Sequence, residues 1–391
     1  MNKITLILYL SICVSSNLLA KPYIPANNET VLLTLPSFGQ SSAIPKNSTI
    51  ESTGSLSDYY KKVSKLLLRA KLESSERLYG EVETLINSPN ITINNHSGLL
   101  LIKADIQQHF HQFDAALITL KKIPNSAQAR LLEANILLTH GDYDKARRSC
   151  TALIGQSSLL LVTTCVTQTT SMRGQLKTSY QILKRTLEQY HNISDETRHW
   201  ALTSLAEMAE RLNENQAAIS NYQQAIQLKN NDLVSRISLS DLYLQQNNLN
   251  EALLVLNGQY ENDAILLRVV NILQKHAKQP ENRPYQKLNT QLTHRIALLE
   301  ARNDALHLDT LAEYYLNNKI KPAEALKWAS AHWKNQKTPR DTRLLLRAAI
   351  LANNREAIKT VQQWQQQHNL EDYWLDEQFK NASPLLIKAS N

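Results

Sequence analysis

The chain has 391 residues, a formal net charge of +8 and only 8 glycines, which is about a third of the usual share. Hydrophobic residues make up 42% of the chain and aromatic residues 6%. These values argue against a β-sandwich, a β-barrel and a glycine-rich phosphate loop, and they predict helices from end to end.

The first twenty residues have the order of a secretory signal peptide. Lys3 supplies a positive start, residues 4–14 are an apolar run, and Ala20 offers a small residue at a cleavage site. We expect cleavage after Ala20 and a mature chain in the periplasm or outside the cell. No later segment approaches twenty apolar residues, so we expect no integral membrane segment in the mature chain.

Residues 21–52 differ from the rest because four prolines stand among Asn, Ser and Thr, with one apolar patch from Val31 to Leu35. This composition predicts an extended leader, and the apolar patch is a candidate occupant of the protein's own groove.

From Ser55 onward, amphipathic helical segments alternate with short breaks, and small residues recur within them. One set recurs at intervals of 30 to 39 residues, and a second set, mostly small, precedes each member by 12 residues. The first set is Ala116, Ala146, Ser179, Ala218 and Ala252; the second is Ala104, Ala134, Thr167, Ala206 and Ser240.

This pattern resembles the tetratricopeptide-repeat (TPR) superfamily, in which two antiparallel helices form a repeat of about 34 residues. The resemblance implies an all-α fold, a right-handed α-solenoid of TPR-like helical hairpins whose first helices line the concave side. The chain also looks like a group of uncharacterised exported TPR proteins of Gram-negative bacteria. That group implies no specific function.

The strength of the pattern divides the chain into segments. We expect a regular TPR array over 97–260, with Glu133 at a position where an apolar residue is usual. Degenerate versions precede and follow it, and Pro280 and Pro284 interrupt the second, where a long irregular helix pair is expected. The expected segments are a signal peptide (1–20), a leader (21–52), a degenerate hairpin (53–96), the regular array (97–260), a degenerate array (261–380) and a tail (381–391).

Two cysteines remain after loss of the signal segment. Cys150 lies at the large-residue position of a second helix, and Cys165 lies in the first helix of the next repeat. Adjacent helix axes are about 8 to 10 Å apart, so the two side chains can reach each other. A disulfide is our prediction, and two thiols packed as small hydrophobic groups remain the alternative.

Motifs of catalysis, metal binding and cofactor binding do not occur in the sequence. It has no phosphate loop, no Gly-x-Ser-x-Gly elbow, no His-Glu-x-x-His helix and no Cys-x-x-Cys pair. We therefore predict no catalytic residue, no metal and no cofactor. Basic residues are scattered and not interleaved with aromatic ones, so we do not expect a nucleic-acid partner.

The candidate binding surface is the concave groove, which we expect to bind a protein or peptide partner. In each first helix the residue after the small one should point into the groove, and apolar neighbours should accept the partner's side chains. The alternative is that these polar residues only keep an exposed groove soluble. Three acids among them suggest a basic ligand. The groove residues are Asp105, Asn135, Gln168, Glu207 and Asp241, with Leu101, Leu131 and Ile237 beside them.

These observations favour a non-enzymatic protein-interaction scaffold of the bacterial envelope. The alternatives are a helical-repeat accessory or enzyme in envelope polysaccharide metabolism, and a structural part of an envelope assembly with a large apolar face. All five tryptophans follow residue 199, and we expect them in the core, with Trp364 and Trp374 helping to cap the C-terminal end.

Overall fold

The structure is a computed structural model that describes residues 55–89, 92–93, 96–123, 125–276, 283–302, 306–318 and 321–387. Contacts divide the chain into two units, 1–53 and 54–391, and every helix named below belongs to the second unit. The predicted signal peptide and its cleavage after Ala20, and the leader with its apolar patch, lie outside the described residues.

Nineteen helices and no strand form the described part of the chain. They are α1 (Leu56–Glu73), α2 (Glu76–Ile86), α3 (Ser97–His109), α4 (Phe113–Leu120), α5 (Ala127–His140), α6 (Tyr143–Thr151), α7 (Leu159–Ser171), α8 (Leu176–Gln189), α9 (Asp195–Arg211), α10 (Asn215–Leu228), α11 (Leu233–Gln245), α12 (Leu249–Leu256), α13 (Asp263–His276), α14 (Arg283–Arg302), α15 (Leu308–Asn318), α16 (Pro322–Trp333), α17 (Pro339–Leu351), α18 (Arg355–His368) and α19 (Tyr373–Ile387).

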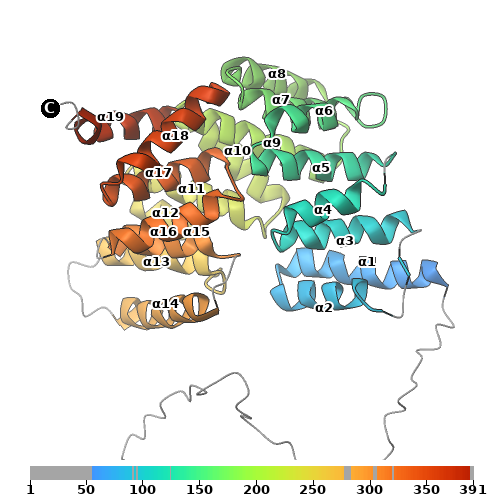
Figure 1. Cartoon of the computed structure of the whole chain (residues 1–391), viewed down its shortest axis with the longest axis horizontal. Coiled ribbons are helices and arrows are strands. Elements are labelled where there is room, and N and C mark those ends of the chain that lie inside the picture. Colours follow the sequence, from blue (N-terminus) through green and yellow to red (C-terminus); the bar gives the residue numbers. More distant parts are fainter. Residues whose placement is uncertain are drawn as a thin grey trace, which may run out of the picture. The chain divides into compact units, whose positions relative to one another are not determined.

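Each odd-numbered helix up to α17 packs on the helix that follows it, and the resulting hairpins stack on their neighbours. The fold is therefore an all-α solenoid of helical hairpins, as predicted. In Figure 1, α1 to α8 rise along one side and α9 and α10 lie towards the middle. Helices α11 to α14 descend along the other side, and α15 to α19 rise along it again. We call α3 to α8 the N-terminal arm and α15 to α19 the C-terminal arm. No helix in the described ranges is long and apolar enough to cross a membrane.

The ten small-position residues lie where the helices of the regular array cross. All ten are at most 3% exposed, so a larger side chain at any of them would push two helices apart. Glu133, the polar exception within the array, accepts a hydrogen bond from Ser149 Oγ at 2.9 Å and so is not left unpaired. The spacing of the small residues thus predicts the helix packing correctly, because small residues occur where the backbones of two helices come close together.

Departures from the regular repeat occur after α12. The hairpin of α13 and α14 occupies the region where prolines interrupt the pattern, and α14 has 20 residues. At the other end, α19 continues to Ile387, so the segment assigned to a tail from residue 381 begins inside this helix.

The C-terminal arm contacts the N-terminal arm, although more than 190 residues of sequence separate the contacting groups (Figure 1). Lys337 N donates to Thr139 O at 2.8 Å, and Tyr143 Oη donates to Lys337 O at 3.0 Å. Leu176 N donates to the Glu371 carboxylate at 2.7 Å. We call this set of interactions the arm contact.

Trp364 belongs to the arm contact and does not cap the C-terminal end. Its ring packs edge-on against Tyr143, and a Cβ on Gly141 would lie 2.6 Å from it. Gly141 has φ +92°, so the turn itself requires a left-handed residue. The prediction of a cap was wrong for Trp364 because the solenoid brings α18 back against the α5–α6 turn.

Candidate functional site

A cavity of about 720 Å³ lies on the inner side of the solenoid. Every odd-numbered helix from α3 to α19 contributes to its wall, whereas Tyr222 of α10 is the one lining residue from an even-numbered helix. The first helices of the hairpins therefore face inward, as the resemblance implied. The volume falls in the range of known ligand pockets, about 300 to 1,000 Å³.

Side-chain amides form one class of lining group. Seven Asn or Gln side chains face the cavity, and none of them hydrogen bonds to another side chain or to the backbone of the described residues. Each comes from a different odd-numbered helix: α3, α5, α7, α11, α13, α15 and α19. The seven are Gln108, Asn135, Gln168, Gln245, Asn271, Asn317 and Gln378.

Ion pairs form the second class, and they link the C-terminal arm to the middle of the solenoid. Asp241 of α11 binds Arg268 of α13 through two bonds of 2.8 and 2.9 Å, and it also accepts from Arg340 of α17 at 2.9 Å. These two arginines surround one carboxylate and lower the pKa of Asp241 despite its burial. Arg347 of α17 binds Glu313 of α15 at 2.8 Å.

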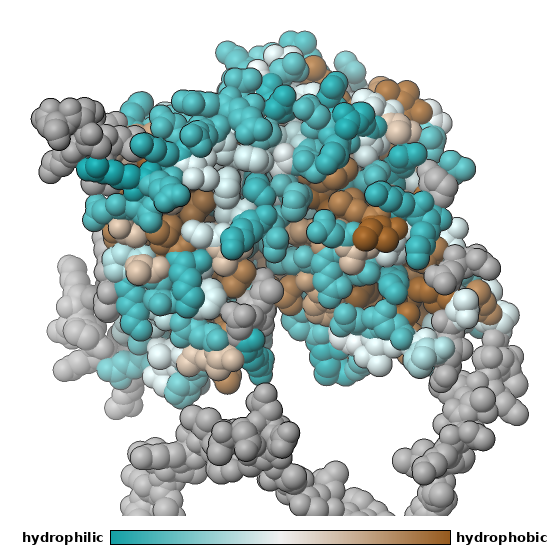
Figure 2. Space-filling model, in the orientation of Figure 1, coloured by the Kyte–Doolittle hydropathy of each residue, from teal (hydrophilic) through white to brown (hydrophobic). Residues whose placement is uncertain are grey.

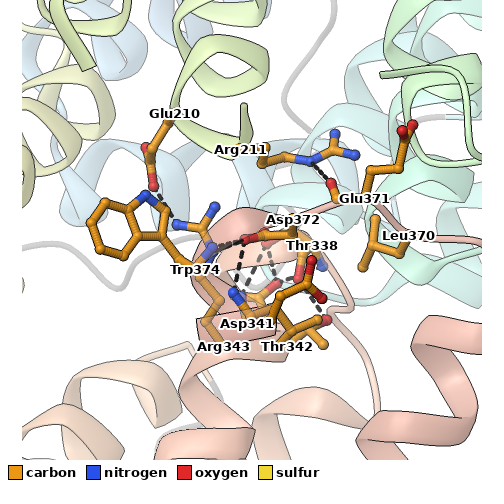
Figure 3. Close-up of polar contacts among 12 residues, drawn as sticks. Glu210, Arg211, Thr338, Asp341, Thr342, Arg343, Leu370, Glu371, Asp372 and Trp374 are labelled. Atoms are coloured by element: carbon orange, nitrogen blue, oxygen red, sulfur yellow. Dashed lines mark hydrogen bonds and ion pairs between the residues drawn. The ribbon is translucent and has the colours of Figure 1, made fainter. Parts of the chain in front are cut away.

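Arg343 lies at the centre of the contact drawn in Figure 3. Its guanidinium donates to Glu210 of α9 and, at 2.8 Å, to Asp372 in the turn before α19. Asp372 is 2% exposed and also accepts from the backbone N–H groups of Trp374 and Leu375 at 3.0 Å. One arginine of α17 therefore holds α9 and α19 in place.

Arg211, one residue after Glu210, completes this link. It is 3% exposed and donates to Glu371 O at 3.1 Å (Figure 3). It also donates to Ser171 Oγ and to Ser171 O. Its donors are used within the protein, so Arg211 joins α7 to the α18–α19 turn and is not available to a ligand.

Glu207 of α9 is the exception among the lining acids. Within the described residues it has no ion pair and no hydrogen bond, and its accessible surface lies on the cavity wall. Its side chain is exposed towards the cavity, yet the protein around it removes part of its water; this desolvation and the nearby Glu210 raise its pKa to about 7, against the opposing effect of Arg211. Among the described residues, Glu207 is thus the one lining acid without a positive partner.

The structure brings four of the five predicted groove residues to this cavity: Asn135, Gln168, Glu207 and Asp241. Asp105 lies instead on a separate cavity of about 290 Å³, beside Tyr79 and His109, where it forms an ion pair with Lys71.

The three apolar groove residues lie elsewhere. Leu101, Leu131 and Ile237 pack in the cores between hairpins and do not line the cavity. They precede the corresponding polar groove positions by about one turn. One turn before the groove position the first helix packs against neighbouring hairpins, so Ile237 is buried there and Leu101 and Leu131 are partly buried.

Other lining residues were not predicted from the sequence. Gln108 and Gln245 lie three and four residues after predicted groove positions, so helical periodicity could have found them. Arg340, Arg343 and Trp374 come from the C-terminal arm, and no local signal indicates that this arm turns inward. Six cationic and four acidic side chains line the cavity, so the expected preference for a basic ligand has no support in its overall charge.

Cys150 and Cys165 are joined by a disulfide in the structure, with a Cα–Cα distance of 5.4 Å. They link α6 to α7, and both are at most 2% exposed. No group of three His, Cys, Asp or Glu side chains in the described ranges is arranged to hold a metal ion.

No family model matches the chain, and no curated protein matches it. Among solved structures, the TPR domain of P58(IPK) matches with 16% identity over 86% of this chain and 99% of that domain, with a TM-score of 0.23. That similarity is too low to support an argument, so the description as a solenoid of hairpins rests on the helices themselves.

Proposed function

We propose that the chain is a non-enzymatic protein-interaction scaffold of the bacterial envelope that binds a polypeptide segment in the cavity. The observation that carries the proposal is the set of seven unbonded amides, one from each odd-numbered helix between α3 and α19 except α9 and α17. An amide side chain both donates and accepts hydrogen bonds, as a peptide backbone does. A row of such groups suits an extended segment, whose N–H and C=O groups need partners when they leave water.

The test is capture of a partner from an envelope extract, followed by comparison of variants. Asn135→Ala together with Gln168→Ala removes two amides from the wall, and we expect the captured partner to bind about 10-fold or more weakly. Gln181→Ala with Gln227→Ala is the matched control, because both residues are exposed on second helices. Equal binding by both double variants would show that the partner uses another surface.

Asp241 is unsuitable for this test although the sequence placed it in the groove. Its removal leaves Arg268 and Arg340 without their carboxylate, so any loss of binding would be mixed with a loss of stability.

The envelope location is part of the same proposal and rests on the signal-like order of residues 1–20. N-terminal sequencing of the mature protein should find Lys21 as the first residue. A chain starting at Met1 in the cytoplasmic fraction would contradict it.

A role in envelope polysaccharide metabolism is the second candidate, and one observation favours it. Trp200, Trp374 and a carboxyl group of raised pKa face the same cavity. Glycoside hydrolysis uses two carboxyl groups, however, and the other three lining acids are each bound by arginine. Titration with soluble oligosaccharides tests this candidate, and binding abolished by Glu207→Gln would favour it.

The structural-assembly alternative predicted a large apolar face. The face in Figure 2 is mostly hydrophilic, and its apolar areas are interrupted by polar side chains. This face therefore lends no support to that alternative.

A further inference from the structure

Glu207 differs from the other charged residues of the cavity in what surrounds it. Its neighbours in sequence, Ala206 and Met208, are 0% and 2% exposed, so its helix is otherwise buried at this point. The open side of Glu207 faces the cavity. A ligand in the cavity would therefore meet this carboxyl group directly.

Glu207 itself is exposed and reaches solvent through the cavity, so a ligand that fills the cavity would take water away from it. A carboxylate that loses water without gaining a partner is unfavourable, and a positive group on the ligand removes that cost. Three arginines of the wall are already engaged: Arg340 with Asp241, Arg343 with Glu210 and Asp372, and Arg211 with Ser171 and Glu371. The protein itself thus supplies the counter-charge for every lining acid except Glu207.

We infer that Glu207 binds a positively charged group of the polypeptide segment, either a lysine or arginine side chain or a free amino terminus. The inference rests on the proposed function, because it assumes that a segment enters the cavity. It requires one positive group at one place and not a basic ligand, which agrees with the mixed charge of the wall.

The face of α9 that carries Glu207 suits such a group. Trp200 and Ser204 lie seven and three residues earlier, so they line the cavity along the same stripe of the helix. An indole offers a surface for the alkyl part of a lysine or arginine and attracts its charge. Ser204 Oγ donates to Trp200 O at 2.7 Å and therefore does not compete for the carboxylate.

A second readout is the pH dependence of binding. The charged groups that act on Glu207 are Glu210 and Asp232, which raise its pKa, and Arg211 and Arg340, which lower it. A bound cation favours the ionised form, so Glu207 should release a proton on binding, and affinity should rise as the pH increases through about 7. Glu207→Gln should abolish this rise.

The probe is a seven-residue peptide selected from a random library against the full chain. The peptide is then made in four forms, with a free or acetylated amino terminus and with its Lys or Arg kept or changed to Gln. Glu207→Gln should weaken the form that carries the recognised cation by about 10- to 100-fold and leave the neutral form within about 2-fold. The form that responds tells a side chain from an amino terminus. Glu188→Gln, an exposed acid of α8, is the control and should change nothing.

Two results would overturn the inference. One leaves the proposed function standing, and the other contradicts the proposed function as well. If selected peptides lose binding with Asn135→Ala and Gln168→Ala but are indifferent to Glu207→Gln, the cation site is wrong and the proposed function stands. If no selected peptide depends on Asn135 and Gln168, the proposed function fails and the inference fails with it.

Discussion

The two sides of the cavity carry different kinds of polar group. On the side of α3 to α13, most of the first helices present amides without protein partners. On the opposite side, α17 presents three arginines on one face, Arg340, Arg343 and Arg347, and each is bound to a carboxylate of another helix. The division is one of predominance, because α15 and α19 also present amides, Asn317 and Gln378, and Arg268 of α13 is bound to Asp241. The arginines of α17, by contrast, are all engaged in holding the solenoid together.

This difference separates binding from stability. Apart from Gln378, whose Oε1 is buried, the unbonded amides of the cavity wall can be solvated, so their loss should cost little free energy of unfolding. An arginine between buried carboxylates cannot be removed in the same way, because its partners would remain charged and unpaired. Variants on the two sides should therefore affect different measurements.

The largest effect is expected for Arg343→Ala. The side chain of Asp372 is fully buried and that of Glu210 is 16% exposed, so the change leaves two acids without their common cation. We expect the free energy of unfolding to fall by about 3 to 5 kcal/mol, measured by denaturant titration. Arg185→Ala, an exposed arginine of α8, should stay within about 0.5 kcal/mol. Equal stability of the two variants would refute the structural role given to α17.

Removal of the disulfide tests the N-terminal arm alone. The bond closes a loop with a sequence separation of 15, for which the loop-entropy model gives about 3 kcal/mol. Cys150→Ala with Cys165→Ala should lower the free energy of unfolding by that amount, and peptide affinity should not change, since both positions are buried away from the cavity. Two reactive thiols in the denatured, unreduced wild-type protein would show that the bond does not form.

Gly141 and Gly155 form a matched pair that isolates the arm contact. Both have positive φ, +92° and +78°, so alanine at either position costs about 1 to 2 kcal/mol in the backbone. Only at Gly141 would the added Cβ also meet Trp364, whereas nothing lies within 4 Å at Gly155. We expect Gly141→Ala to be less stable than Gly155→Ala by about 1 to 3 kcal/mol in thermal unfolding. No difference would mean that the arms do not meet at this turn.

The smallest effect is a pH dependence at the same contact. His368 accepts a hydrogen bond from Arg173 at 3.1 Å, and its burial, together with Arg173, lowers its pKa. Asp144 and Asp142 oppose this shift only in part. Below about pH 6.5 the unfolded chain takes up the proton first, so His368 reduces stability as the pH falls.

A variant isolates this contribution from other titrating groups. His368→Gln removes the titrating group. From pH 7.5 to pH 5 we expect the wild type to lose more free energy of unfolding than the variant does. A difference that is constant over this range would contradict the assignment.

The sequence was sufficient for the hairpins and for four of the residues that line the cavity. Small residues such as Ala104 and Ala116 lie where the two helices of a hairpin cross. Because this crossing is local and recurs in each hairpin, the small residues recur in the sequence. The same spacing locates Asn135, Gln168 and Glu207 because each follows a crossing residue by one position.

The rest of the site depends on contacts that no local pattern encodes. Arg343 meets Glu210 across 133 residues, and Leu176 meets Glu371 across 195. Whether such segments meet depends on the curvature accumulated over many hairpins, and small changes in each hairpin add up. The sequence could not indicate this curvature. Trp364 was therefore predicted to cap the C-terminal end, whereas it packs against Tyr143 of the N-terminal arm.

The closure of the two arms in solution is the claim on which the cavity depends, and a distance between spin labels tests it most directly. Arg147→Cys on α6 and Lys359→Cys on α18 place labels on exposed residues of the two arms, and Cys13→Ser avoids labelling of the N-terminal segment. Double electron–electron resonance should give one narrow distance distribution that broadens when Arg343→Ala is added. A broad distribution in the chain that keeps Arg343 would show that the arms are open and that the closed cavity is not the resting state.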